Sequence, residues 1–208
     1  MRRHGGFPHW IRYSAGLAPG ETEAVDVEAG ETLPPHAGLA GVIVTGSGAM
    51  VTERRDWSEA TAAWLRGAAH AGVPVFGICY GHQLLAHALG GEVADNPRGI
   101  EMGTVDLELL DAAADDPLFA GLPQRFQAQA THVQSVLRPP EGATLLAASP
   151  LDDAHAFRWG DAAWGVQFHP EFSAGHMRGY VDARRERLAA HGHDPEAIHA
   201  AVRAAPDA

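Results

Sequence analysis

Short apolar runs alternate with helix-like segments in the first half of the chain. Residues 38–45 and 73–78 are apolar, rich in valine and isoleucine, and followed by glycine-containing turns, which is typical of buried strands. Between them, apolar residues recur at helical spacing over 57–68, after a segment 56–59 (DWSE) that resembles a capping box. Residues 82–89 predict a second helix. This strand–helix–strand order predicts a parallel sheet covered on both faces.

The second half of the chain has a different pattern, in which apolar and polar residues alternate one by one. Alternation of this kind predicts half-exposed strands, which are typically antiparallel. The candidate strands are 104–109, 126–130, 143–148, 154–159 and 162–168. The chain then becomes helical: Ser173 can cap a helix extending to Leu188, and Asp194-Pro195 opens a last short helix.

The start of the chain contains only a weak helix over 7–17 and no strand. A doubly wound fold usually opens with a central strand, so either that strand lies upstream of this sequence or the sheet lacks it. We therefore expect an α/β fold with a doubly wound, flavodoxin-like mixed sheet, helices on both faces and an antiparallel extension. No linker is evident, so we expect one domain over residues 1–208.

Composition narrows the functional classes. Hydrophobic residues make up 46% of the 208 residues, which is enough for a core, and no apolar run is long enough to span a membrane. A net charge of −11 argues against nucleic-acid binding. One cysteine and a start without a secretory signal suit the reducing cytoplasm. The thirteen histidines are scattered, and even the pair His191 and His193 gives no metal-site signature, so we expect no metal and no cofactor.

The single cysteine, Cys79, follows the strand-like run in Gly77-Ile-Cys79-Tyr-Gly81, just before the predicted helix. It is either a small core residue or a nucleophile on a sharp turn. The flanking glycines favour the nucleophile, because they let strand and helix approach closely, and the helix N-terminus favours a thiolate.

A base for this thiol is available in His169-Pro170-Glu171, which ends another strand-like run. In an extended segment His169 and Glu171 share a face, so the carboxylate can orient the imidazole. The alternative is an ordinary surface turn. An oxyanion would need two N–H donors, which the amides of Tyr80 and of Ser47 can supply, although the Ser47 loop could equally be a plain strand-to-helix turn.

These motifs together resemble the class I, triad-type glutamine amidotransferases, most of all free-standing chains similar to the glutaminase domain of GMP synthase. The resemblance covers roughly residues 37–172. It implies that Cys79 forms a γ-glutamyl thioester, that His169 is the acid and base, and that Glu171 orients it. It also implies that Gln83, Gly46, His132, Val133 and Gln134 bind the substrate glutamine.

The sequence departs from this family at Gly46-Ser47-Gly48, where many members have Gly-Gly-Pro or Asn-Gly-Pro. We expect hydrolysis of glutamine or of a γ-glutamyl compound. Alternatives are a non-catalytic or partner-activated subunit delivering ammonia to a separate synthetase, and a redox protein, which would leave Gln83 and His169 without a role. We interpret Arg98 and Glu101 as solvated rather than substrate-binding.

Overall fold

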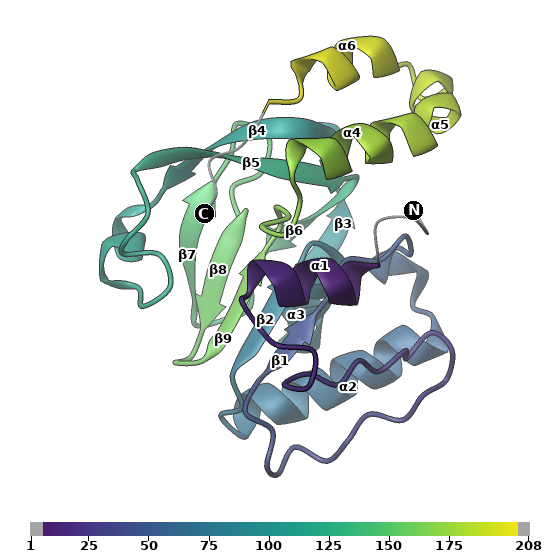
Figure 1. Ribbon diagram of the computed structural model, residues 1–208. Helices are drawn as coiled ribbons and strands as arrows, with labels where there is room; N and C mark the ends of the chain where they lie inside the picture. The colour runs from purple at the N-terminus through teal and green to yellow at the C-terminus, as the bar shows by residue number, and fades with distance from the viewer. Residues whose placement is uncertain (1–5, 204–208) are drawn as a thin grey trace.

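The computed structural model describes residues 6–203, and its centre is a seven-stranded mixed sheet in the order β1-β2-β9-β8-β7-β4-β5 (Figure 1). The first three strands in this order are parallel, and the remaining four continue the sheet antiparallel. This confirms the predicted mixed sheet with an antiparallel extension. The strands are β1 (Val42–Val44), β2 (Val75–Ile78), β4 (Glu101–Leu109), β5 (Arg125–His132), β7 (Ala143–Ala148), β8 (Ala156–Trp159) and β9 (Ala163–Val166).

Helices cover both faces of the sheet, as predicted. Helices α2 (Asp56–His70) and α3 (Tyr80–Ala88) pack on one face, and their alanines and leucines form a core with Val75 and Phe157. Helix α1 (Phe7–Ser14) lies on the other face, where Ile11 joins a second core (Figure 1). The short 3-10 turns η1 (Val51–Glu53) and η2 (Asp111–Asp115) follow β1 and β4.

Three further helices lie along β4 at the top of Figure 1. They are α4 (Ala174–Ala183), α5 (Arg185–Ala190) and α6 (Pro195–Ala201). Ser173 caps α4 and Asp194 caps α6, as predicted. Met177, Tyr180 and Leu188 form a third apolar cluster beneath these helices. None of the helices within residues 6–203 is both long and apolar enough to cross a bilayer.

Several local predictions were wrong. Asp56 does not cap α2, because the helix starts at this residue and Arg55 occupies the capping position without a side-chain bond. The single helix expected after Ser173 is broken at Arg184, where the backbone leaves helical geometry. A small second sheet, β3 (Glu92–Asp95) with β6 (Gln134–Arg138), was not predicted.

The opening strand is also absent from the described part of the chain, where α1 is the only element before β1. The sheet within residues 6–203 therefore lacks that strand. β1 is consequently an edge strand that pairs only with β2.

Candidate active site

Cys79 occupies the sharp turn between β2 and α3. Its backbone has φ 52° and ψ −103°, a strained conformation for a side-chain-bearing residue and one that is found mainly at functional sites. The flanking glycines are required by close packing. A Cβ at Gly77 would lie 2.5 Å from the carbonyl oxygen of Gly81, and one at Gly81 would lie 2.3 Å from that of Val44. The turn therefore presents Cys79 at the N-terminus of α3 with 7% of its surface exposed.

His169 lies just beyond β9 and is held in place from three sides. Its backbone N–H donates to the carbonyl oxygen of Gln129 (2.7 Å), and its ring stacks on Phe172 with centroids 4.2 Å apart. Nδ1 lies 2.8 Å from Oε1 of Glu171. Because a carboxylate accepts, Nδ1 carries the proton and donates to Glu171. Both side chains are almost fully buried.

The other ring nitrogen of His169, Nε2, is buried and has no conventional hydrogen-bond partner among residues 6–203. The S–H of Cys79 donates instead to the carbonyl oxygen of Thr131 (3.7 Å), and Cys79 acts on the ring electrostatically. Burial alone would lower the pKa of His169, but the negative charge on Cys79 and on Glu171 outweighs it and raises the pKa from 6.5 to about 10. The arrangement thus favours the protonated form of the His169 imidazole.

Two residues near Cys79 are candidate oxyanion donors. Ser47 and Tyr80 both line the cavity that contains Cys79. Tyr80 is the first residue of α3, where helix geometry leaves the N–H without an intrahelical partner. The Ser47 hydroxyl accepts from the N–H of Ala49 (3.1 Å), which orders the loop. Gly46 faces the imidazole, since a Cβ there would lie 3.0 Å from Cε1 of His169.

Gln83 lies in the cavity wall, but its amide hydrogens are used within the protein. Nε2 donates to the carbonyl oxygen of Gln134 (2.7 Å) and to Oε1 of Gln167 (2.9 Å). The side chain of Gln134 in turn donates to Thr52 (2.6 Å) and Asp95 (2.9 Å). These glutamines therefore fix the start of β6 against α3. Because the NH₂ group of Gln83 is already used, only its side-chain carbonyl oxygen is left for contact with a substrate.

Glu101 is buried, so the prediction that it is solvated was wrong. It faces His132 in the register of β4 and β5, and its Oε2 lies 2.9 Å from Nε2 of both His132 and His155. Ser149 donates to Oε1 (2.6 Å). Burial tends to raise the pKa of Glu101, but hydrogen bonds from His132 and His155 lower it well below its usual 4.5. Arg98, by contrast, is exposed and pairs with Asp153.

The same cluster is the one group of side chains within residues 6–203 whose geometry could suit a metal ion. Ligand atoms of Glu101, His132 and His155 lie within 4.8 Å of one another. All three side chains are already joined by the hydrogen bonds around Oε2, so the cluster is internally paired. Nδ1 of His132 also donates to the carbonyl oxygen of Gln134 (3.0 Å), which links the cluster to the start of β6.

One cavity of about 170 Å³ lies at this site. The predicted residues Ser47, Cys79, Tyr80 and Gln83 lie in its wall, together with the segment 131–134. The segment consists of the end of β5 and the first residue of β6, joined by Val133. The opposite wall comes from α4, α5 and the segment after them.

The length of its match to a protein-family profile establishes the family to which the chain belongs. A profile described as "Glutamine amidotransferase class-I" matches residues 17–182, which is most of the chain. The chain belongs to this family. The matched range includes Cys79, His169 and Glu171, and the last two are joined by the hydrogen bond described above.

Individual relatives agree with this assignment. The amidotransferase is 44% identical over 142 residues to a GMP synthase (glutamine-hydrolyzing) from Aeropyrum pernix, a match covering 68% of this chain and 25% of that protein. It is 39% identical over 100 residues to one subunit of a GMP synthase (glutamine-hydrolyzing) from Methanothermobacter thermautotrophicus, covering 48% of this chain and 52% of the relative. The chain thus spans about a quarter to a half of these relatives.

Solved structures show the same fold. A crystal structure of a glutamine amidotransferase from Thermotoga maritima superposes with a TM-score of 0.76 and 24% identity over 93% of this chain and 82% of that one. A glutamine amidotransferase structure from Methylobacillus flagellatus superposes with a TM-score of 0.76 at 25% identity, covering 88% and 72% of the two chains.

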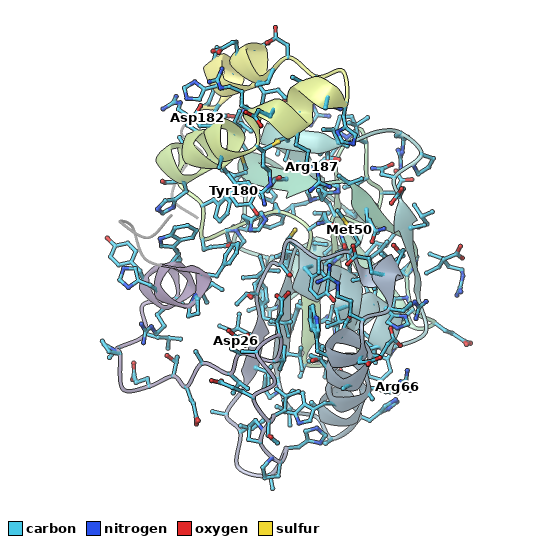
Figure 2. All side chains as sticks on the ribbon, turned by 90° about the vertical axis from the view of Figure 1, so that its right-hand side faces the viewer. Asp26, Met50, Arg66, Tyr180, Asp182 and Arg187 are labelled. Carbon is cyan, nitrogen blue, oxygen red and sulfur yellow. The ribbon has the colours of Figure 1, made fainter. Side chains whose placement is uncertain are left out.

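Sequence reasoning missed the cavity wall that this amidotransferase builds from its C-terminal helices. Tyr180, Arg184 and Arg187 line the cavity, as does Met50 from the loop after β1. Figure 2 shows Tyr180 and Arg187 on the underside of the helices, facing the part of the molecule that carries Met50. The sequence predicts a helix over Tyr180 and Arg184, but nothing local indicates that this helix lies over Cys79.

Proposed function

We propose that this amidotransferase hydrolyses the γ-amide of glutamine, or of a γ-glutamyl compound, through a thioester on Cys79. The observation that carries the proposal is the imidazole of His169, which donates to Glu171 through Nδ1 and interacts with Cys79 on its other side. A nucleophile, a base and an orienting carboxylate in this order are what acyl transfer requires.

In the first half-reaction, the sulfur of Cys79 attacks the γ-carbonyl carbon of the substrate. The amides of Ser47 and Tyr80 stabilise the oxyanion that forms. The C–N bond then breaks as His169 gives its Nε2 proton to the leaving nitrogen, which departs as ammonia or an amine. A γ-glutamyl thioester remains on Cys79.

In the second half-reaction, a water molecule takes the place of the departed amine. His169 accepts a proton from this water, which attacks the thioester carbonyl and forms a second oxyanion. Breaking the C–S bond releases glutamate and restores the pair of Cys79 and His169. Glu171 keeps its hydrogen bond to Nδ1 throughout and holds the ring in one orientation.

A second candidate is a chain that is active only with a separate synthetase partner, to which it delivers ammonia. The observation favouring it is that relatives from Methanothermobacter thermautotrophicus and Thermococcus kodakarensis are themselves subunits of a GMP synthase rather than whole enzymes.

We also propose that residues 1–208 form one amidotransferase domain and that it is cytoplasmic. The single domain is supported by the seven-stranded sheet, whose strands come from positions 42–166.

The test is glutamate release by the purified chain, given L-glutamine and a panel of γ-glutamyl amides, with Cys79→Ala as the control. Turnover that disappears in Cys79→Ala is the expected result. Turnover that persists in Cys79→Ala would exclude the thioester. Release of glutamate only after a synthetase is added would favour the partner-dependent chain.

A further inference from the structure

The wall of the cavity opposite Cys79 is positively charged. Arg184, Arg187, His191 and His193 all line it. The side chain of Arg187 is exposed and makes no ion pair or hydrogen bond with any residue from 6 to 203. Arg184 donates to the hydroxyl of Tyr180 (2.7 Å) and lies 3.5 Å above its ring, without a carboxylate partner in that same range. Two guanidinium groups therefore face the cavity without a counter-charge.

The nearby acidic side chains do not neutralise this wall. Asp182 and Glu196 both pair with Arg185, one position after Arg184. The single carboxylate among the described residues lining the cavity is Glu101, which is bound by two histidines and a serine. In a chain with a net charge of −11, an unpaired cationic wall at this cavity indicates an anionic ligand.

The wall lies on the side from which the leaving group departs. His169 stacks on Phe172 (centroids 4.2 Å apart), Phe172 packs against Tyr180 (5.5 Å), and Arg184 lies over Tyr180. Tyr180 and Cys79 line the same cavity. Because His169 protonates the leaving nitrogen, whatever is attached to that nitrogen extends toward these arginines.

We propose that Arg187, together with Arg184, binds a carboxylate carried by the leaving amine, so that the preferred substrates are γ-glutamyl amino acids rather than glutamine. The inference rests on the proposed function of Cys79. A guanidinium can bind a carboxylate through two parallel hydrogen bonds, which gives orientation as well as affinity. Hydrolysis then consumes one water and releases glutamate and a free amino acid, with the peptide C–N bond broken and no redox change.

The first experiment compares kcat/KM for γ-glutamylglycine with kcat/KM for γ-glutamylmethylamide, which has the same amide without the second carboxylate. In Arg187→Gln, the ratio of the two values should fall roughly ten- to hundred-fold, mainly through KM. The matched control is Arg185→Gln, on the same helix but outside the cavity wall, where the ratio should stay within about twofold.

An unchanged ratio in Arg187→Gln would overturn the inference, even if activity on both substrates fell together, because a structural effect or binding of the α-carboxylate lowers both. Arg187→Lys should restore part of the ratio, since it returns the charge without the bidentate geometry.

A second measurement separates this inference from the proposed function. Binding to the Cys79→Ala protein, measured by calorimetry, needs no turnover. γ-Glutamylglycine should bind at least about tenfold more tightly than γ-glutamylmethylamide, and adding Arg187→Gln should remove the difference. Equal affinities would refute the carboxylate site whether or not the chain is catalytic. Absence of turnover together with this binding preference would refute the hydrolase alone.

Discussion

Replacing Glu101 by glutamine should destabilise the fold strongly, although the residue lies at a cavity wall. Its side chain is 5% exposed and accepts from His132, His155 and Ser149 at 2.9, 2.9 and 2.6 Å. The carbonyl oxygen of glutamine can accept only some of these three hydrogen bonds, and its NH₂ group would face one of the histidine N–H or serine O–H donors. Removing one partner of a buried charge network typically costs about 3 to 5 kcal/mol, which is the loss that we expect in the free energy of unfolding.

The assay is urea unfolding of the Glu101→Gln protein as a function of pH. The matched control is Glu108→Gln on the same strand, whose pairing with Arg125 is exposed and should contribute less than about 1 kcal/mol. The lowered pKa of Glu101 means that its stabilisation is complete above pH 4.5 and is lost as the pH falls below that value. The difference between the unmodified protein and Glu101→Gln should therefore shrink in acid. A difference below about 1 kcal/mol at neutral pH would refute the reasoning.

Three further predictions concern the catalytic turn and its base. The charge of Cys79 is the largest influence that raises the pKa of His169, and Cys79→Ala removes it. An NMR titration of the His169 ring should therefore show its pKa falling from about 10 toward 6.5 or below. An unchanged pKa would contradict the electrostatic coupling of His169 to Cys79. Glu171→Gln should lower kcat for glutamate release about 10²- to 10⁴-fold, and a loss below tenfold would mean that the carboxylate does not orient the ring. Gly81→Ala should clearly lower the melting temperature, because the added Cβ would lie 2.3 Å from the carbonyl oxygen of Val44. An unaltered melting temperature would show that the turn is not closely packed.

The sequence predicted well those features that depend on neighbouring residues. The strand candidate over 143–148 has the observed bounds of β7, and the turn around Cys79 followed from its flanking glycines. The predicted contact between His169 and Glu171 is present, but it forms across a turn, in which the N–H of Phe172 donates to the carbonyl oxygen of His169, and not along extended backbone.

Features assembled from distant segments could not be predicted in this way. Glu101 looked like a loop residue, and its burial depends on pairing with His132 across the sheet and on His155 from the segment before β8. The break at Arg184, which turns α5 over the cavity, has no glycine or proline to indicate it. The cationic wall was missed for the same reason, since only tertiary packing places Arg187 opposite Cys79.

The most direct test of the central claim is covalent trapping of Cys79 by an electrophilic analogue of glutamine, such as a chloroketone, followed by intact-protein mass spectrometry. The account predicts one adduct per chain, located on Cys79, slowed by excess substrate and by His169→Gln, and absent from Cys79→Ala. No adduct on the unmodified protein, or an equal rate of modification in His169→Gln, would contradict a cysteine nucleophile activated by this histidine.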